Sequence, residues 1–154
     1  MPDGAEAQLL TEVLRRISDA LGLDAEIDVV EGEYDLRGTL HGEDLGLFVG
    51  RHGQTIDAVQ HLAQRAVATL VGEQRRVVVD AEGYRGRRQA ALERQAADAA
   101  DDAVRSDRAV ALGAMTAGER RLVHEFLRDR VDVATHSEGE EPERHLVVSP
   151  APAS

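Results

Sequence analysis

Apolar residues recur along the first part of the chain with two periods, one typical of helices and one typical of strands. A helical spacing is set near the N-terminus by Leu10, Val13, Leu14, Ile17 and Leu21. Residues 34–41 instead alternate apolar or small residues with polar ones, which predicts a strand half-buried on a sheet. Residues 25–30 predict a preceding strand, joined to it by a hairpin turn at 31–33.

The next segment predicts a short helix, a glycine-bounded loop, a longer helix and a strand. The short helix is expected over 45–49, and Phe48 within it is expected in the core. The longer helix keeps an apolar period through Ile56, Val59, Ala63, Val67 and Leu70. Residues 75–80 contain three consecutive valines and predict a buried strand. Tyr34 and Tyr84 are expected as packing residues at the edges of elements.

The loop between the two helices reads Gly50-Arg51-His52-Gly53 and is a candidate site for an anion. Its glycines allow another backbone to come close, and the amides that open the next helix carry partial positive charge. In nucleic-acid-binding modules a GXXG loop clamps about four nucleotides. Because the motif is short, an ordinary turn between helices is the alternative interpretation.

Residues 84–107 are rich in Ala, Arg, Gln and Glu and predict one long helix. Its first turn carries three candidate contacts to a nucleic-acid backbone, Arg85, Arg87 and Arg88. Cations are unfavourable at the N-terminal end of a helix, so their position invites a functional explanation. The alternative is that Asp80 and Glu82, just upstream, neutralise them.

A further amphipathic helix begins where Thr116 and Glu119 form a T-x-x-E capping box. At about 100° per residue, one face carries Leu122, Val123, Phe126 and Leu127. The opposite face carries the candidate nucleic-acid contacts Arg120, Arg121, His124 and Arg128. Arg120 and His124 stand one turn apart, so both can reach the same phosphate or carboxylate, although the spacing alone favours a solvated basic face. Two short strands, 131–137 and 144–148, are expected after this helix.

Composition narrows the classes of function. The chain has 154 residues and a net charge of −11, and all 18 of its basic residues are arginine, which favours local phosphate contacts over strong attraction of a polyanion. Cysteine is absent, and the six histidines show no metal-binding spacing. His124-Glu125 opens like a zinc-binding H-E-x-x-H motif, but Arg128 replaces the second histidine. We therefore expect no enzyme, metal or cofactor, and a cytoplasmic protein with neither an export signal nor a membrane-spanning segment.

Two motifs carry a resemblance to known families. The order of elements around the Gly-Arg-His-Gly loop resembles a bacterial-type (type II) KH domain. Arg-x-x-x-His, followed by T-x-S-x-G-x-x-P-x-R, resembles the R-3-H domain, in which Arg144 would be a further basic contact. Together with the E-G-Y-R-G-R-R junction at 82–88, this order resembles the Jag (SpoIIIJ-associated) family. Many members of that family carry a separate N-terminal domain and a linker before the KH module, and we expect this chain to lack both.

The resemblance implies an α+β protein with a KH domain at 1–82, a connecting helix at 83–107 and an R-3-H domain at 108–150. The KH domain is expected to have a three-stranded sheet with packed helices, and the R-3-H domain to be small and α/β. The implied function is cytoplasmic binding of single-stranded RNA without catalysis, as an RNA chaperone or post-transcriptional regulator linked to cell elongation and division. A small stand-alone KH protein is an implied partner. Single-stranded DNA binding is an alternative, as is a protein-interaction adaptor that recruits a partner through its first helix.

Overall fold

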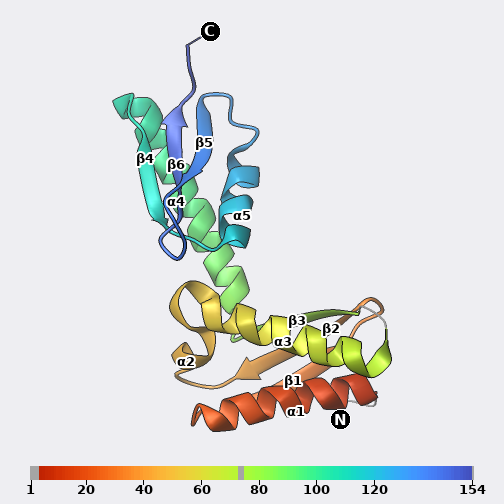
Figure 1. The fold of residues 1–154 in the computed structure, drawn as a ribbon. Coiled ribbons are helices and arrows are strands. Elements are labelled where there is room, and N and C mark those ends of the chain that lie inside the picture. The colour runs from red at the N-terminus through yellow and green to blue at the C-terminus, as the bar shows by residue number, and fades with distance from the viewer. Residues whose placement is uncertain (1–3, 73–74, 154) are drawn as a thin grey trace. The chain divides into compact units, whose positions relative to one another are not determined.

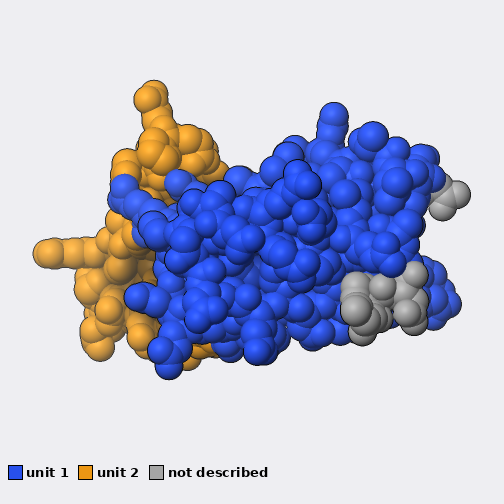
Figure 2. All heavy atoms as spheres, turned by 90° about the horizontal axis from the view of Figure 1, so that it is seen from below, with its two compact units in different colours: residues 1–85 blue, residues 86–154 orange. Residues whose placement is uncertain are grey.

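The computed structural model of the chain describes residues 4–72 and 75–153. They divide into two compact units, residues 1–85 and residues 86–154 (Figure 2). Each unit has its own three-stranded sheet and its own hydrophobic core (Figure 1). The boundary between them falls at the first turn of helix α4 (Tyr84–Ser106).

Unit 1 has the order of elements that the sequence predicts. It contains α1 (Ala5–Ala20), β1 (Glu26–Glu31), β2 (Asp35–His41), α2 (Gly46–Val49), the 3-10 turn η1 (Arg51–Gly53), α3 (Gln54–Val71) and β3 (Arg76–Ala81). Strand β2 lies between the other two, antiparallel to β1 and parallel to β3. Helix α1 packs on β1 and β2, and α3 packs on β3 and α1. The first helix therefore uses its apolar face within unit 1, which removes the main support for partner recruitment through it.

The core of unit 1 follows the predicted alternation along β2. Leu36 and Leu40 are fully buried, and so is Phe48 of the short helix, which confirms its expected place in the core. Tyr84 packs against the same cluster. The prediction is wrong for Tyr34, which is 79% exposed. It precedes β2 at the hairpin turn, so the sheet does not impose its alternation there.

Unit 2 contains a strand that the sequence did not predict. Its elements are most of α4, then β4 (Val110–Ala114), α5 (Ala117–Leu127), β5 (Val133–Glu138) and β6 (His145–Pro150). Strand β6 lies between β4 and β5 and is antiparallel to both. The sequence predicts only β5 and β6. The segment of β4, Val-Ala-Leu-Gly-Ala, has weak strand propensity, and its pairing with the distant β6 makes it a strand.

Helix α4 is also a core element of unit 2. Its buried side chains are Leu92, Ala96, Ala99, Ala100 and Ala103. They form one cluster with Val123 and Leu127 of α5 and with Leu146 and Val148 of β6. The small alanine side chains allow close approach to the elements that cover them. The helix expected to connect two domains thus contributes to folding the second unit, while the boundaries at 82/83 and 107/108 stay predictions.

Candidate nucleic-acid interface

The Gly-Arg-His-Gly loop of unit 1 depends on two left-handed glycines. Gly50 has φ +74° and Gly53 has φ +76°, a region that residues with a Cβ rarely adopt. A Cβ at Gly50 would lie 2.1 Å from Thr55 Oγ1 and 2.9 Å from the Thr55 backbone nitrogen. Only glycine allows the chain to turn this tightly onto the first turn of α3.

The loop presents a basic side chain beside the open end of a helix. Arg51 is exposed and His52 is half-buried, and Arg51 Nε donates to His52 Nε2 at 3.3 Å. Helix α3 begins at Gln54, and its N-cap residue is Gly53, which has no side chain to cap the helix. The first amides of a helix lack partners within the helix and carry partial positive charge. The loop and the start of α3 therefore form a surface suited to a phosphate group.

The beginning of α4 holds this loop in place. A Cβ at Gly53 would lie 2.8 Å from the Tyr84 hydroxyl, so the aromatic ring packs directly on that glycine. Arg85 Nη1 forms an ion pair with Asp57 Oδ1 at 2.8 Å, in the first turn of α3. Arg85 Nε also donates to the Val79 carbonyl oxygen at 2.8 Å. Asp57 places a negative charge beside the surface suited to a phosphate group, and its ion pair with Arg85 offsets that charge.

The three predicted backbone contacts of the junction lie in different surroundings. Arg85 and Arg88 are engaged within their own units, since Arg88 forms two hydrogen bonds with Glu119, one of them 2.7 Å from Nε to Oε1. Arg87 is the exposed member of the set. Neutralisation by Asp80, the alternative considered for these arginines, takes another form for Arg85, because Asp80 Oδ1 accepts from the Arg85 backbone nitrogen at 3.2 Å at the start of α4.

In unit 2, the start of α5 confirms the predicted capping box. The Glu119 backbone nitrogen donates to Thr116 Oγ1 at 3.2 Å, and the Thr116 backbone nitrogen donates to Glu119 Oε2 at 3.1 Å. The same Glu119 carboxylate accepts from Arg88 of α4. One acidic side chain thus sets both the start of α5 and its attachment to α4.

Arg120 is largely covered, whereas the amphipathic pattern predicts an exposed basic face. Its side chain is only 12% exposed, and Nη2 donates to Glu141 Oε1 at 2.6 Å. Nη1 lies 3.5 Å from Ser137 Oγ, at the limit of a hydrogen bond. Among the described residues, its buried Nε atom has no hydrogen-bond partner. The segment after β5 covers this guanidinium with a carboxylate.

The Arg-x-x-x-His and T-x-S motifs face each other. His124 Nδ1 forms a short hydrogen bond with Thr135 Oγ1, one turn along α5 from the contact between Arg120 and Ser137. Thr135 and Ser137 are two residues apart on β5, so their side chains share one face of the strand. The sequence shows both motifs, but only the packing of α5 on β5 shows that they form one polar cluster.

The remaining predicted residues of this face surround the cluster with further arginines. Arg121 is exposed and pairs with Glu125 on the same helix, and Arg128 is exposed at its end. Arg144 Nη1 donates to the Gly139 carbonyl oxygen at 2.6 Å, which ties it to the acidic segment 138–143. These residues all lie within unit 2.

Arg130 has acidic partners that the sequence does not single out. It donates to both carboxylate oxygens of Asp132 and to Asp101 of α4. The hydrogen bonds to Asp132 and Asp101 raise the pKa of Arg130 above its ordinary value, and the hydrogen bond from Arg130 lowers the pKa of Asp132. Arg130 therefore links Asp101 and Asp132 within unit 2, whereas Arg128 is exposed at the end of α5.

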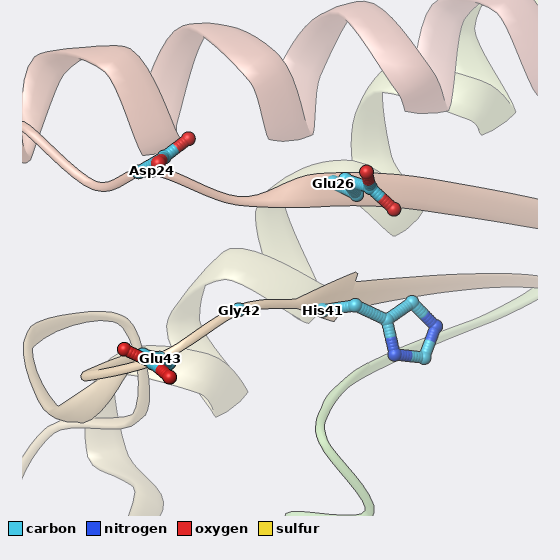
Figure 3. Close-up of a pocket in the computed structure, with 5 residues that line it drawn as sticks. All are labelled: Asp24, Glu26, His41, Gly42 and Glu43. Carbon is cyan, nitrogen blue, oxygen red and sulfur yellow. The ribbon is translucent and has the colours of Figure 1, made fainter.

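A separate pocket in unit 1 is unsuited to phosphate. Asp24, Glu26, His41, Gly42 and Glu43 line it, and they come from two neighbouring chain segments (Figure 3). His41 Nδ1 also lies 3.7 Å from Glu82 Oε1. Its acidic lining repels a polyanion, and within the described ranges no cluster of three metal-binding side chains occurs here or elsewhere. None of the described helices is both long and apolar enough to cross a membrane.

Comparison with known proteins agrees with this two-part organisation. The KhpA/KhpB KH-domain family matches residues 7–80, and the R-3-H domain family matches residues 90–150. The chain is 37% identical over 140 residues to the RNA-binding protein KhpB of Clostridium symbiosum, covering 90% of this chain and 63% of that relative. It is 33% identical over 138 residues to the RNA-binding protein KhpB of Bacillus subtilis, covering 88% of this chain and 66% of that relative. A third KhpB, from Lactiplantibacillus plantarum, is 35% identical over 140 residues, and the chain spans 44% of its length.

The two units and their motifs define an α+β protein in which a type II KH domain is followed by an R-3-H domain. The chain belongs to the Jag family, which includes the KhpB proteins, and this confirms the resemblance carried by the sequence motifs. It spans about two thirds or less of the length of the three KhpB proteins to which it is compared.

Proposed function

We propose that this chain binds single-stranded RNA through two sites, the Gly-Arg-His-Gly loop of unit 1 and the Arg120/His124 face of unit 2. The observation that carries the proposal is the loop geometry, in which two left-handed glycines lead directly into the uncapped N-terminus of α3. Its place in a KH domain, and the names of the KhpB relatives as RNA-binding proteins, support the choice of RNA. The proposed role is binding and not catalysis.

At the first site, the loop clamps the phosphodiester backbone of about four nucleotides, as GXXG loops do in KH domains. Arg51 and the first amides of α3 contact the phosphates, and His52 adds a polar group to the same turn. Phe48 is buried and is not a base contact. Leu47 of α2 is 64% exposed just before the loop, so it offers an apolar surface on which a base can pack.

At the second site, Arg120 and His124 bind a phosphate that replaces the Glu141 carboxylate. A guanidinium fork suits a phosphate as well as a carboxylate. Arg121, Arg128 and Arg144 surround this position and add positive charge. Thr135 and Ser137 hold the two central side chains in place through their hydroxyls.

Two modest sites on one chain raise the apparent affinity without either being tight, because the second binding event is intramolecular. The net charge of −11 opposes non-specific attraction of nucleic acid, so we expect contacts to be local and binding to weaken strongly as salt rises. Aromatic residues make up only 3% of the chain, which disfavours a platform of stacked bases.

The wider role that we propose is inherited from the family. It comprises a cytoplasmic location, RNA chaperoning or post-transcriptional regulation linked to cell elongation and division, and pairing with a small stand-alone KH protein. The match to a KH family named for both KhpA and KhpB supports the partner. Mixing the purified chain with such a protein and measuring the mass of the complex by light scattering tests that part directly.

The test of the first site is fluorescence anisotropy with short single-stranded RNA and DNA pools at several salt concentrations. Arg51→Asp with His52→Asp should remove most of the RNA affinity while the circular dichroism spectrum stays unchanged. The matched control is Gln8→Asp with Arg15→Asp, which changes the charge equally at exposed positions of α1. Equal losses in both variants, or no binding by the wild-type chain at low salt, would reject the clamp. Tighter binding of DNA would change the proposed ligand.

The second site is tested by Arg120→Ala with His124→Ala. We expect weaker binding and a smaller slope of log affinity against log salt. On a single strand the slope should fall by about 0.7 for each phosphate that the variant no longer neutralises. An unchanged slope would show that this face is only a polar cluster of the fold.

A further inference from the structure

A hollow on unit 1 collects basic side chains that neither proposed site uses. It lies between α3 and the start of β3, which pack side by side (Figure 1). His61, Gln64, Arg65, Ala68, Arg75 and Arg76 line it. Among the described residues that line it, none is acidic, which is unusual for a chain with a net charge of −11.

The charges in this hollow are not equally available. Arg75 forms an ion pair with Glu6 and donates to the Gly32 carbonyl oxygen at 2.8 Å, and its side chain is 24% exposed. Gln64 accepts from the Val77 backbone nitrogen at 2.7 Å and donates to the Arg75 carbonyl oxygen, so it fixes the wall of the hollow.

Arg65 and Arg76, in contrast, are exposed, and within the described part of the chain neither side chain has a hydrogen bond or ion pair. Two guanidinium groups therefore face solvent together, with His61 beside them. We call His61, Arg65 and Arg76 the basic patch of α3 and β3.

One exposed side of α3 runs from the Gly-Arg-His-Gly loop to the basic patch. At about 100° per residue, Gln54, Ala58, His61 and Arg65 fall within an arc of about 60° and form an exposed ridge. Arg65 is about 18 Å along the helix from Gly53, at 1.5 Å per residue. The ridge carries no acidic residue, and the neighbouring Asp57 is neutralised by Arg85. Along these four ridge residues, a negatively charged strand that leaves the loop meets only neutral or basic side chains.

We propose that Arg65 and Arg76 form a second phosphate subsite of unit 1, which binds the backbone of the same single strand beyond the nucleotides held by the loop. The inference rests on the proposed function. Arginine is suited to this task because its planar guanidinium pairs with phosphate oxygens through two N–H groups. The fixed wall formed by Gln64 and Arg75 supports the two free arginines from behind.

The experiment measures binding of labelled single-stranded oligonucleotides of about four nucleotides, the length held by a KH loop, and of about twice that length. Arg65→Gln with Arg76→Gln is compared with a matched control, Arg15→Gln with Arg16→Gln, which removes two exposed charges from α1. The Arg51→Asp/His52→Asp variant is measured in parallel. Circular dichroism checks that every variant is folded.

On the longer strand, the Arg65/Arg76 variant should bind about tenfold more weakly at low salt, with a salt slope lower by about 1.4, which corresponds to two phosphates. On the shorter strand it should match the wild-type chain. The loop variant should lose affinity for both lengths.

The outcomes separate the two proposals. If the loop variant loses binding but the Arg65/Arg76 variant behaves like the Arg15/Arg16 control on both lengths, the subsite is overturned and the loop clamp stands. If the Arg65/Arg76 variant loses affinity equally for both lengths, the patch belongs to the loop site and is not a separate subsite. If the loop variant binds both lengths normally, the proposed clamp itself has failed.

Discussion

Arg120 Nη2 and Glu141 Oε1 lie 2.6 Å apart, joining the Arg-x-x-x-His helix to the acidic segment 138–143. The guanidinium is nearly covered, while the carboxylate is largely open to solvent. A carboxylate thus occupies the place that we assign to an RNA phosphate. If the proposed binding face of unit 2 is correct, it holds an internal competitor of the same charge, which an RNA strand would have to displace.

Glu141→Gln should therefore tighten RNA binding. Removing the competing charge frees the Arg120 guanidinium. Because the Glu141 carboxylate is largely open to solvent, the ion pair contributes up to about 1 kcal/mol, which corresponds to roughly a two- to fivefold gain in affinity. Glu140→Gln is the matched control, since it removes the same charge one residue away. Anisotropy titrations that give equal gains for the two variants would show that only the net charge matters.

The ion pair between Arg88 and Glu119 should contribute measurably to stability, because both side chains are mostly buried in unit 2. Arg88→Ala should lower the free energy of unfolding by about 1–2 kcal/mol. Glu119→Ala should cost more, because it also removes the capping box of α5. Urea unfolding of both single variants and the double variant gives their coupling energy. Arg94→Ala, at an exposed position of the same helix, serves as the control, and an equal loss there would contradict a specific pair.

Gly53→Ala should destabilise the chain through two separate effects. A left-handed backbone costs an L-residue about 1–2 kcal/mol, and the new methyl group would also collide with the Tyr84 hydroxyl, 2.8 Å away. Gly22→Ala isolates the first effect, since Gly22 has φ +69° and its Cβ would meet nothing within 4 Å. Chemical denaturation should show a larger loss for Gly53→Ala, and part of that excess should disappear in a Tyr84→Ala background.

The pair formed by Arg130 and Asp132 leads to a prediction of how the stability of unit 2 changes at acid pH. Its pKa is lower in the folded chain because Arg130 donates hydrogen bonds to its carboxylate. The pair therefore stabilises the fold above the ordinary Asp pKa near 3.9, and this contribution is lost as pH falls through the lower folded-state pKa. Asp132→Asn should flatten the fall of Tm between about pH 5 and pH 2, whereas Asp129→Asn, at an exposed neighbouring position, should leave its steepness unchanged. Parallel curves for Asp132→Asn and the wild-type chain would contradict the prediction.

Features encoded over a few neighbouring residues could be predicted from the sequence. The alternation along β2 placed Leu36 and Leu40 in the core, and the T-x-x-E spacing placed the start of α5. The strand β4 could not be predicted in this way. Its small residues carry little periodic signal, and its partner β6 lies more than thirty residues later in the chain.

The candidate sites show the same division. The two glycines of the loop were visible in the sequence, because the backbone conformation that they allow is a local property. The partners of Arg85, Arg88 and Arg120 were not visible, since each pairs with an acid that is 28, 31 or 21 residues away. The neighbouring acids Asp80 and Glu82 were the obvious candidates for Arg85, but the ion pair formed with Asp57 of α3.

Patterns along the chain were thus enough to establish the order of elements in unit 1, the Gly-Arg-His-Gly loop, the Arg-x-x-x-His spacing and the family. Periodicity, turns and caps arise from interactions between residues close in the chain, so they are readable without a fold. The packed fold was needed to show that Arg120 faces Glu141, that His124 faces Thr135, and that Arg65 and Arg76 share one surface. Which of many arginines and acids become neighbours depends on how helices pack on sheets, because charge attraction alone does not select a partner.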